Sequence, residues 1–570
     1  MAAFPPETRT RRTTEVVGSL AFAAAVLGLL LACFPYFEAV RNANELPRVA
    51  QAVSMATEGR LDLGRFVGAG FDLGPDLARG PDGRLYPNKP PGVSAVGAAA
   101  VVAARAAGAP PKTLRQATFL LRLAAAMFPV ALFVFAAHRR LRSAGVFPAR
   151  ARAALWAVVF GTPLFAYGRL AYGHALAAVL LFLGISLCAR ALAEARPARA
   201  LTGGFVAGLS VVADYGAVFA AVPIGLVLVS SLRTRAYFVT AAAVLGAAVP
   251  MAALAGYHHV AFGSPLATGY HAVTTPAFAA KHAVGFVGLS RPTAAGFWRQ
   301  ILDPGFGLLA WAPAAVPAVV GLAVLALRPG PLREEARIHL GIAVVYGLVV
   351  SGLVFDGGWR VGPRYMVVAF PGLALGLARA LAWARTRRAA AVLLAAIFVY
   401  SWIVNALAAG LWPHFDPAAV RQPVFEVLVP LWRGGFAPYG LPEGPSVVLA
   451  AVLVVGLFDL LPALAWADPE PPPSRFFGRR AAPSRPPAAA AEPPPARGAA
   501  AFLRALALPP APDGRGVLLA VTAGVALGAV LVAALHLVSP HPRAAANLAY
   551  IERVYEPPRH GPAPDSRPLP

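Results

Sequence analysis

The segment VVGSLAFAAAVLGLLLACFPYF, residues 16–37, contains no charged side chain over 22 positions. A bilayer core of about 30 Å is crossed by a helix of roughly 20 apolar residues, so the segment predicts a membrane-spanning helix. Arg9, Arg11 and Arg12 precede it, an arrangement that also occurs in lipoprotein signals, here with Cys33 as the lipidated residue. Because the apolar sequence continues past Cys33, we favour an uncleaved helix.

Similar apolar segments recur along the chain. Of its 570 residues, 58% are hydrophobic and 13% are charged, which is too apolar for an ordinary soluble protein. The rule of about 20 residues per span predicts about thirteen transmembrane helices, and therefore an all-α polytopic membrane protein. The expected spans are residues 16–37, 117–137, 153–167, 175–193, 201–213, 216–231, 236–257, 306–327, 338–355, 365–384, 389–411, 446–466 and 516–538.

The positive charges indicate the orientation of these spans. The net charge of +24 would suggest a nucleic-acid partner in a soluble protein, but most arginines lie in short loops between apolar segments. With a cytoplasmic N-terminus, the short inner segments hold 19 arginines and the short outer loops 8 basic residues. This asymmetry favours that orientation and no nucleic-acid partner. Residues 93–107 are read as a helix on or partly in the outer face; the alternative is a span that inverts every later segment.

The composition divides the chain into a membrane module and a tail. Residues 467–512 are rich in proline, alanine and arginine, so they predict a disordered linker. The expected parts are a cytoplasmic N-terminus (1–15), a transmembrane catalytic module (16–411), an outer loop with one helix (412–466), the cytoplasmic linker (467–512), the last helix (513–539) and an outer tail (540–570).

The longest expected outer loop, residues 38–116, holds 7 of the 26 acidic residues. After Asn44 and Glu45, apolar residues recur at helical spacing up to Gly59. This pattern predicts a short amphipathic helix lying on the bilayer. Sugar transfer from a phosphate-linked lipid needs a base for the acceptor, and Glu45 and Asn44 are the candidate catalytic residues.

The same loop ends in YPNKPPG, residues 86–92, which contains Lys89, one of only three lysines. Two prolines after Lys89 fix the backbone at the turn into the next helix. A compact ammonium there suits a leaving phosphate, although an interfacial lysine that anchors the helix is an equally simple interpretation. Arg360 and Arg364, in residues 355–372, are further candidates for binding the donor phosphate.

Other polar residues interrupt the expected outer segments. His174, His258, Tyr270 and Asp356 are candidates for substrate binding. Adjacent His258 and His259 point apart on a helix or strand, and the two cysteines lie inside apolar segments. We therefore assign no metal ligands and no cofactor, and nothing in the sequence supports a divalent metal.

Several segments together resemble the GT-C glycosyltransferases, which include protein O-mannosyltransferases and transferases that add aminoarabinose to lipid A. The resemblance covers about the first 410 residues. It rests on Asn44-Glu45 with the following amphipathic segment, YPNKPPG, Arg122-Leu123, TPLFAYGRLAYGHALAA (162–178) and GGFVAGLSVVADY (203–215).

The resemblance implies a GT-C-like fold in the bacterial cytoplasmic membrane, with an outward-facing active site. The donor would be a polyprenyl-phosphate sugar, the acceptor a lipid, glycan or protein, and the displacement inverting. Glu45 would be the acidic residue near the acceptor, and Lys89, with Arg364 as a looser candidate, would hold the departing phosphate. The family often has aspartate-glutamate where this chain has Asn44-Glu45. The alternative function is a flippase or transporter of lipid-linked saccharides, for which polar groups deep in the spans are typical.

Overall fold

The computed structural model describes residues 6–32, 43–230, 237–354, 357–436 and 444–465, together with 526, 530 and 568–570. This part of the chain is helical except for loops and one antiparallel hairpin, formed by β1 (Leu77–Arg79) and β2 (Leu85–Pro87). The prediction of an all-α membrane protein is confirmed at this level. The expected linker, the last helix apart from residues 526 and 530, and nearly all of the tail lie outside the described residues.

Seven helical segments in the described ranges are long and apolar enough to cross a bilayer. They lie in α1 (Pro6–Ala32), the continuous α5 (Leu114–Arg122), η1 (Leu123–Met127) and α6 (Phe128–Ser143), α9 (Gly173–Glu194), α12 (Tyr237–Phe262), η6 (Arg364–Ala369) with α18 (Phe370–Ala384), α19 (Arg388–Gly410) and α21 (Gly444–Ala465). Shorter apolar helices are α4 (Gly92–Ala106), α10 (Pro197–Ala213), η2 (Tyr215–Ala220) with α11 (Ala221–Ser230), and α16 (Ala315–Leu327). The total of about thirteen spans stays a prediction.

Two expected spans are interrupted by proline. The segment 153–167 forms α7 (Pro148–Phe160) and, after Pro163, the short α8 (Leu164–Tyr167). The segment 306–327 forms α15 (Leu308–Trp311) and α16, with Pro313 between them. Proline lacks the amide hydrogen of a helix interior and disfavours helical geometry in the residue before it. Ala312, just before Pro313, accordingly has φ −142° and ψ 59°.

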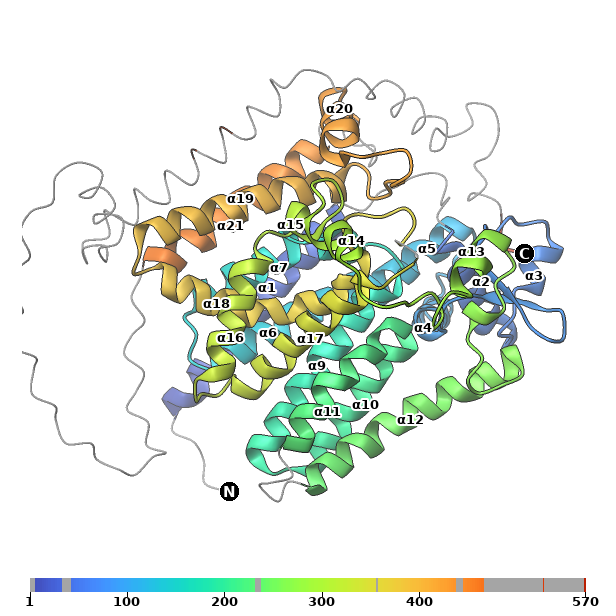
Figure 1. The fold of residues 1–570 in the computed structure, drawn as a ribbon, viewed down its shortest axis with the longest axis horizontal. Helices are drawn as coiled ribbons and strands as arrows, with labels where there is room; N and C mark the ends of the chain where they lie inside the picture. The colour runs from blue at the N-terminus through green and yellow to red at the C-terminus, as the bar shows by residue number, and fades with distance from the viewer. Residues whose placement is uncertain are drawn as a thin grey trace, which may run out of the picture.

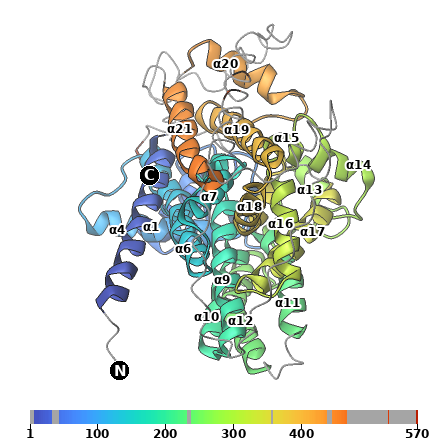
Figure 2. The same cartoon turned by 90° about the vertical axis from the view of Figure 1, so that its left-hand side faces the viewer.

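Helix α9 lies centrally among the long helices. In Figure 1, α2 (Leu46–Glu58), α3 (Gly64–Gly68), α4 and α13 (Pro276–His282) lie together at the right-hand end of the helices. The view turned by 90° shows α1 on one side and α14 (Ala294–Phe297) on the other, with α9 between them (Figure 2). Contacts between α4 and α9 connect the helices of the first long loop to this central helix.

The predicted amphipathic helix in this loop is confirmed as α2, and Gly59 ends it in a left-handed conformation with φ 67°. Every residue from Leu46 to Ser54 is buried, because α4 and α5 pack against α2. Protein therefore covers this part of α2, which differs from the expectation of a helix lying on the bilayer.

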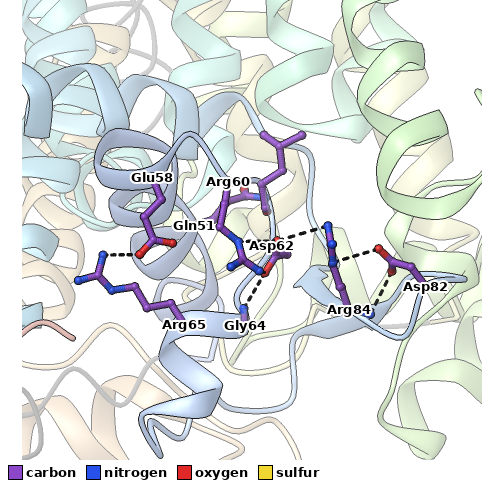
Figure 3. Close-up of polar contacts among 9 residues, drawn as sticks. Gln51, Glu58, Arg60, Asp62, Gly64, Arg65, Asp82 and Arg84 are labelled. Atoms are coloured by element: carbon purple, nitrogen blue, oxygen red, sulfur yellow. Dashed lines mark hydrogen bonds and ion pairs between the residues drawn. The ribbon is translucent and has the colours of Figure 1, made fainter.

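Polar contacts fix the chain between α2 and the hairpin (Figure 3). Asp62 accepts a hydrogen bond from the Gly64 amide at 2.9 Å and forms an ion pair with Arg60 at 2.9 Å. Arg84, just before β2, lies 4.0 Å from Asp62 and 3.4 Å from Asp82. The hairpin, and the YPNKPPG segment that begins within β2, are thereby tied to the end of α2.

The remaining described elements complete the chain between and after these helices. They are η4 (Gly269–His271), η5 (Trp298–Leu302), α17 (Arg333–Ser351), η7 (Val424–Leu428) and α20 (Val429–Arg433).

Candidate active site

His174 and Asp214 meet where α9 begins and α10 ends. Nδ1 of His174 is in hydrogen-bond contact with Oδ2 of Asp214, whose Oδ1 accepts a bond from the Gly216 amide at 3.0 Å. Gly173 permits the approach, because a Cβ on it would collide with the Ala213 carbonyl oxygen. A histidine whose Nδ1 hydrogen is held by a carboxylate has its basic lone pair on Nε2.

Arg48 reaches the same region from the first turns of α2. Its Nη1 contacts the side-chain oxygen of Asn44, four residues earlier, and lies 3.1 Å from the Asn44 carbonyl oxygen. The same atom is 3.4 Å from the carbonyl oxygen of Ala171, just before α9. Arg48 is 3% exposed, so α2 carries a buried cation to the start of α9. Asn44, a candidate catalytic residue, orients this cation.

Lys89 is buried in the YPNKPPG turn. Its Nζ lies 3.8 Å from Oδ2 of Asp76 and 4.8 Å from the centre of the Tyr270 ring. Asp76 also accepts hydrogen bonds from the side-chain amides of Asn44, at 3.3 Å, and Asn88, at 3.4 Å. Burial lowers the pKa of Lys89 to about 8; Asp76 opposes this shift. The ammonium is thus held among protein groups with little water.

Arg364 contributes a third buried cation from the start of η6. Its guanidinium lies 5.8 Å from the centre of the Tyr172 ring and 5.2 Å from that of Tyr365, and Nη2 is 3.4 Å from the Tyr365 hydroxyl. Within the described ranges its Nε has no hydrogen-bond partner. Tyr365 also packs edge-on against His174, with ring centres 5.5 Å apart, which joins Arg364 to the histidine. Asp356, predicted nearby, lies outside the described residues.

We refer to these six buried or nearly buried residues as the polar centre: Arg48, Asp76, Lys89, His174, Asp214 and Arg364. The positive charges of Arg364 and Arg48 lower the pKa of Lys89 further, so both arginines act electrostatically on the lysine. Against them stand two carboxylates, Asp76 and Asp214. Cations withdrawn from water are stable only when compensated, so an excess of positive charge in the polar centre favours an anionic ligand.

Glu45 lies beside the polar centre but is itself compensated. Its two oxygens accept bonds from Nε and Nη2 of Arg122, both at 2.7 Å, and Oε1 also accepts the Ala171 amide hydrogen at 2.7 Å. Burial opposes ionisation, yet Arg122 and the Ala171 amide outweigh it and hold the pKa of Glu45 below its ordinary value. The carboxylate is fully buried. Its role as a base stays a prediction, and these contacts favour a positioning role.

The other predicted site residues lie around the polar centre at different depths. Tyr270 stacks on His282, with ring centres 4.4 Å apart, and packs against Lys89, so its ring borders the polar centre. His258 uses both ring nitrogens on protein partners, Nε2 with the Tyr215 hydroxyl at 2.9 Å and Nδ1 with the Pro265 carbonyl at 3.2 Å. His258 thus holds Tyr215 and the Pro265 backbone in place and supports the local fold.

Arg360 is placed differently from Arg364. Its backbone amide donates to the Phe415 carbonyl at 2.9 Å, and its buried guanidinium lies 5.3 Å from the centre of the Phe306 ring. The structure therefore brings Lys89, Arg364, His174 and Tyr270 together and packs Arg360 against the Phe306 ring. Among the described residues, no group of three or more His, Cys, Asp or Glu side chains is arranged to hold a metal ion.

The sequence placed Asp214 among the polar residues of the expected outer face, but Arg48, Asp76 and Asp214 were not among the candidate site residues. The spacing of Asn44 and Arg48, one helical turn apart, was a usable signal, because residues i and i+4 are neighbours on a helix. Asp76 had no comparable signal, since its proximity to Lys89 depends on the fold of the hairpin. No model of a known protein family matches this chain, and no curated protein shows significant similarity to it.

Proposed function

We propose that this protein is a membrane glycosyltransferase that takes a sugar from a polyprenyl-phosphate donor at the polar centre. The observation that carries the proposal is the convergence of Arg48, Lys89 and Arg364, three buried cations, beside the His174–Asp214 pair. Cations fixed where negative charge develops stabilise a leaving phosphate without reorganisation. Their position at the ends of apolar helices suits a donor whose polyprenyl chain stays in the bilayer.

The cations differ in how they can act on phosphate. Arg48 and Arg364 present planar guanidinium groups, which can bind phosphate oxygens in pairs. Lys89 provides a point charge, held between Asp76 and the Tyr270 ring. Aromatic rings at Tyr172, Tyr270 and Tyr365 line this region, and aromatic faces of this kind pack well against a sugar ring.

The acceptor needs a base, and the geometry favours His174. Nε2 would take the proton of the acceptor hydroxyl or amine while the acceptor atom forms a bond to the anomeric carbon. The bond between that carbon and the phosphate oxygen breaks in the same step, and its electron pair leaves with the phosphate. Asp214, bonded to Nδ1, stabilises the imidazolium that results.

The placement of these groups favours an enzyme over a transporter. His174 is the second residue of α9, Asp214 follows α10 and Arg364 begins η6, so these groups of the polar centre lie at helix ends. A transporter typically has its substrate groups near the middle of the bilayer, on interrupted helices.

The proposal is tested by sugar transfer in membranes that contain the full chain. Radiolabelled polyprenyl-phosphate sugars are supplied as a panel, and the unaltered protein is compared with Lys89→Ala and with Lys112→Ala, an exposed lysine of the same loop. We expect transfer from at least one donor, lost in Lys89→Ala and kept in Lys112→Ala. Absence of transfer from every donor, or equal transfer by both variants, contradicts the proposal.

A further inference from the structure

A second cationic site lies at the opposite ends of the membrane helices. A cavity of about 210 Å³ is bounded by the α6–α7 turn with the start of α7, by the α16–α17 turn and by α18. The described residues that line it include Arg150, Arg328, Arg333 and Arg379, and none of these described lining residues is an aspartate or glutamate. We call it the arginine cavity.

Helix α18 places the arginine cavity far from the polar centre. Arg364 is the first residue of the continuous η6–α18 segment. Ala382, which lines the cavity, lies near the end of that segment. The lining residues of α18 run from Leu375 to Ala382, which are 11 to 18 positions beyond Arg364. At about 1.5 Å for each residue, the two levels are roughly 17–27 Å apart along the helix axis, a large part of a bilayer core of about 30 Å. The two sites therefore lie toward opposite ends of this helical segment.

Two acidic residues that directly follow the lining residue Arg333 in sequence have other partners. Glu335 accepts a bond from Nε of Arg140 at 2.7 Å, and Glu334 pairs with Arg337 at 3.1 Å. Arg140 also donates to the Pro331 carbonyl at 2.5 Å, which fixes the α16–α17 turn against α6. The cavity walls are thus preformed, and these two carboxylates are engaged away from the arginines that line the cavity.

Neighbouring apolar side chains place the cavity at the level of lipid headgroups. Trp383, which follows Ala382, is 47% exposed, and Leu327 just before Arg328 is 79% exposed. Arg387 lies over the Trp383 ring, 4.8 Å from its centre. An exposed tryptophan among arginines is typical of the membrane–water interface.

We propose that the arginine cavity binds the phosphate group of an anionic phospholipid. Pockets for drug-sized ligands measure about 300–1,000 Å³, so the cavity suits a small headgroup, with the acyl chains outside along α16 and α18. Basic pockets between membrane helices bind anionic headgroups in this way. Sugar transfer at the polar centre is not required for this inference.

The test uses the full chain in detergent micelles and counts bound lipid by native mass spectrometry. The probes are dioleoyl phosphatidylglycerol, dioleoyl phosphatidylcholine and inorganic phosphate, and the variant is Arg328→Gln with Arg379→Gln. Each basic residue near a membrane surface contributes about 1 kcal/mol, so the double variant should lose roughly tenfold to thirtyfold in affinity for phosphatidylglycerol. Arg139→Gln with Arg388→Gln removes the same charge outside the cavity and should retain binding.

Three results would overturn the inference. They are equal binding of phosphatidylcholine, equal losses in the cavity and control variants, and displacement of the lipid by millimolar inorganic phosphate, which would assign the cavity to a free anion. If the glutamine variant does not fold, Arg328→Lys with Arg379→Lys replaces it, and loss of the planar groups should still weaken phosphatidylglycerol binding severalfold.

Discussion

Glu45 and Arg122 form a two-bond ion pair, with both nitrogen–oxygen distances at 2.7 Å, although they are 77 residues apart in sequence. The pair joins the start of α2 to the end of α5, next to a π-helical turn, and leaves Glu45 fully buried. A carboxylate with these contacts is a poor general base, because its proton affinity is reduced by the cation that it binds.

We expect Glu45→Gln to destabilise the protein. Removing one partner of a buried pair leaves the other charge uncompensated, which costs about 3–5 kcal/mol. Thermal unfolding in detergent measures the effect, and Glu58→Gln, in a partly exposed pair with Arg65, should change it little. Normal stability together with lost sugar transfer in Glu45→Gln would instead support the predicted base role.

The pKa of Lys89, lowered to about 8 by burial, predicts a pH dependence of donor binding. The ammonium binds phosphate and the neutral amine does not, so affinity should be full well below pH 8 and fall as the pH rises through about 8. Lys89→Arg keeps its charge throughout this range and should remove the fall. Donor dissociation constants between pH 6.5 and 9.5 measure this; an unaltered alkaline fall in Lys89→Arg would assign the titration to another group.

The fold of the first loop was predicted in part, and the reasons differ between residues. The extent of α2 followed from the apolar spacing and from Gly59, both local features. The burial of α2 did not, because it depends on α4 and α5 packing against it. Lys89 could be singled out by its rarity and its prolines, whereas Arg122 as the partner of Glu45, and Asp76 as that of Lys89, arise only from tertiary contacts. Pro163 and Pro313 are visible in the sequence as possible helix breaks. Both segments are nevertheless apolar enough to be predicted as uninterrupted spans.

His174→Gln is expected to lower kcat by about 10²–10⁴-fold with little effect on donor affinity, the range typical for loss of a general base. Asp214→Asn keeps the size of the partner but removes its charge, so it should lower kcat less and retain binding. Rates at saturating donor and acceptor, with donor affinity measured separately, distinguish these effects. A parallel loss of affinity and stability in His174→Gln would mean that the histidine only supports the fold.

The contact between α9 and α10 provides a test that leaves every charged group in place. Gly173→Ala adds a Cβ that meets the Ala213 carbonyl oxygen, so α9 must move away from α10 and carry His174 away from Asp214. Overpacking of this kind costs about 1–3 kcal/mol, and we expect a lower melting temperature together with reduced sugar transfer. Gly256→Ala in α12 is the matched control, since its Cβ meets no atom of the described residues within 4 Å and alanine is the better helix former. Equal behaviour of the two variants would show that the close approach at Gly173 does not maintain the His174–Asp214 contact.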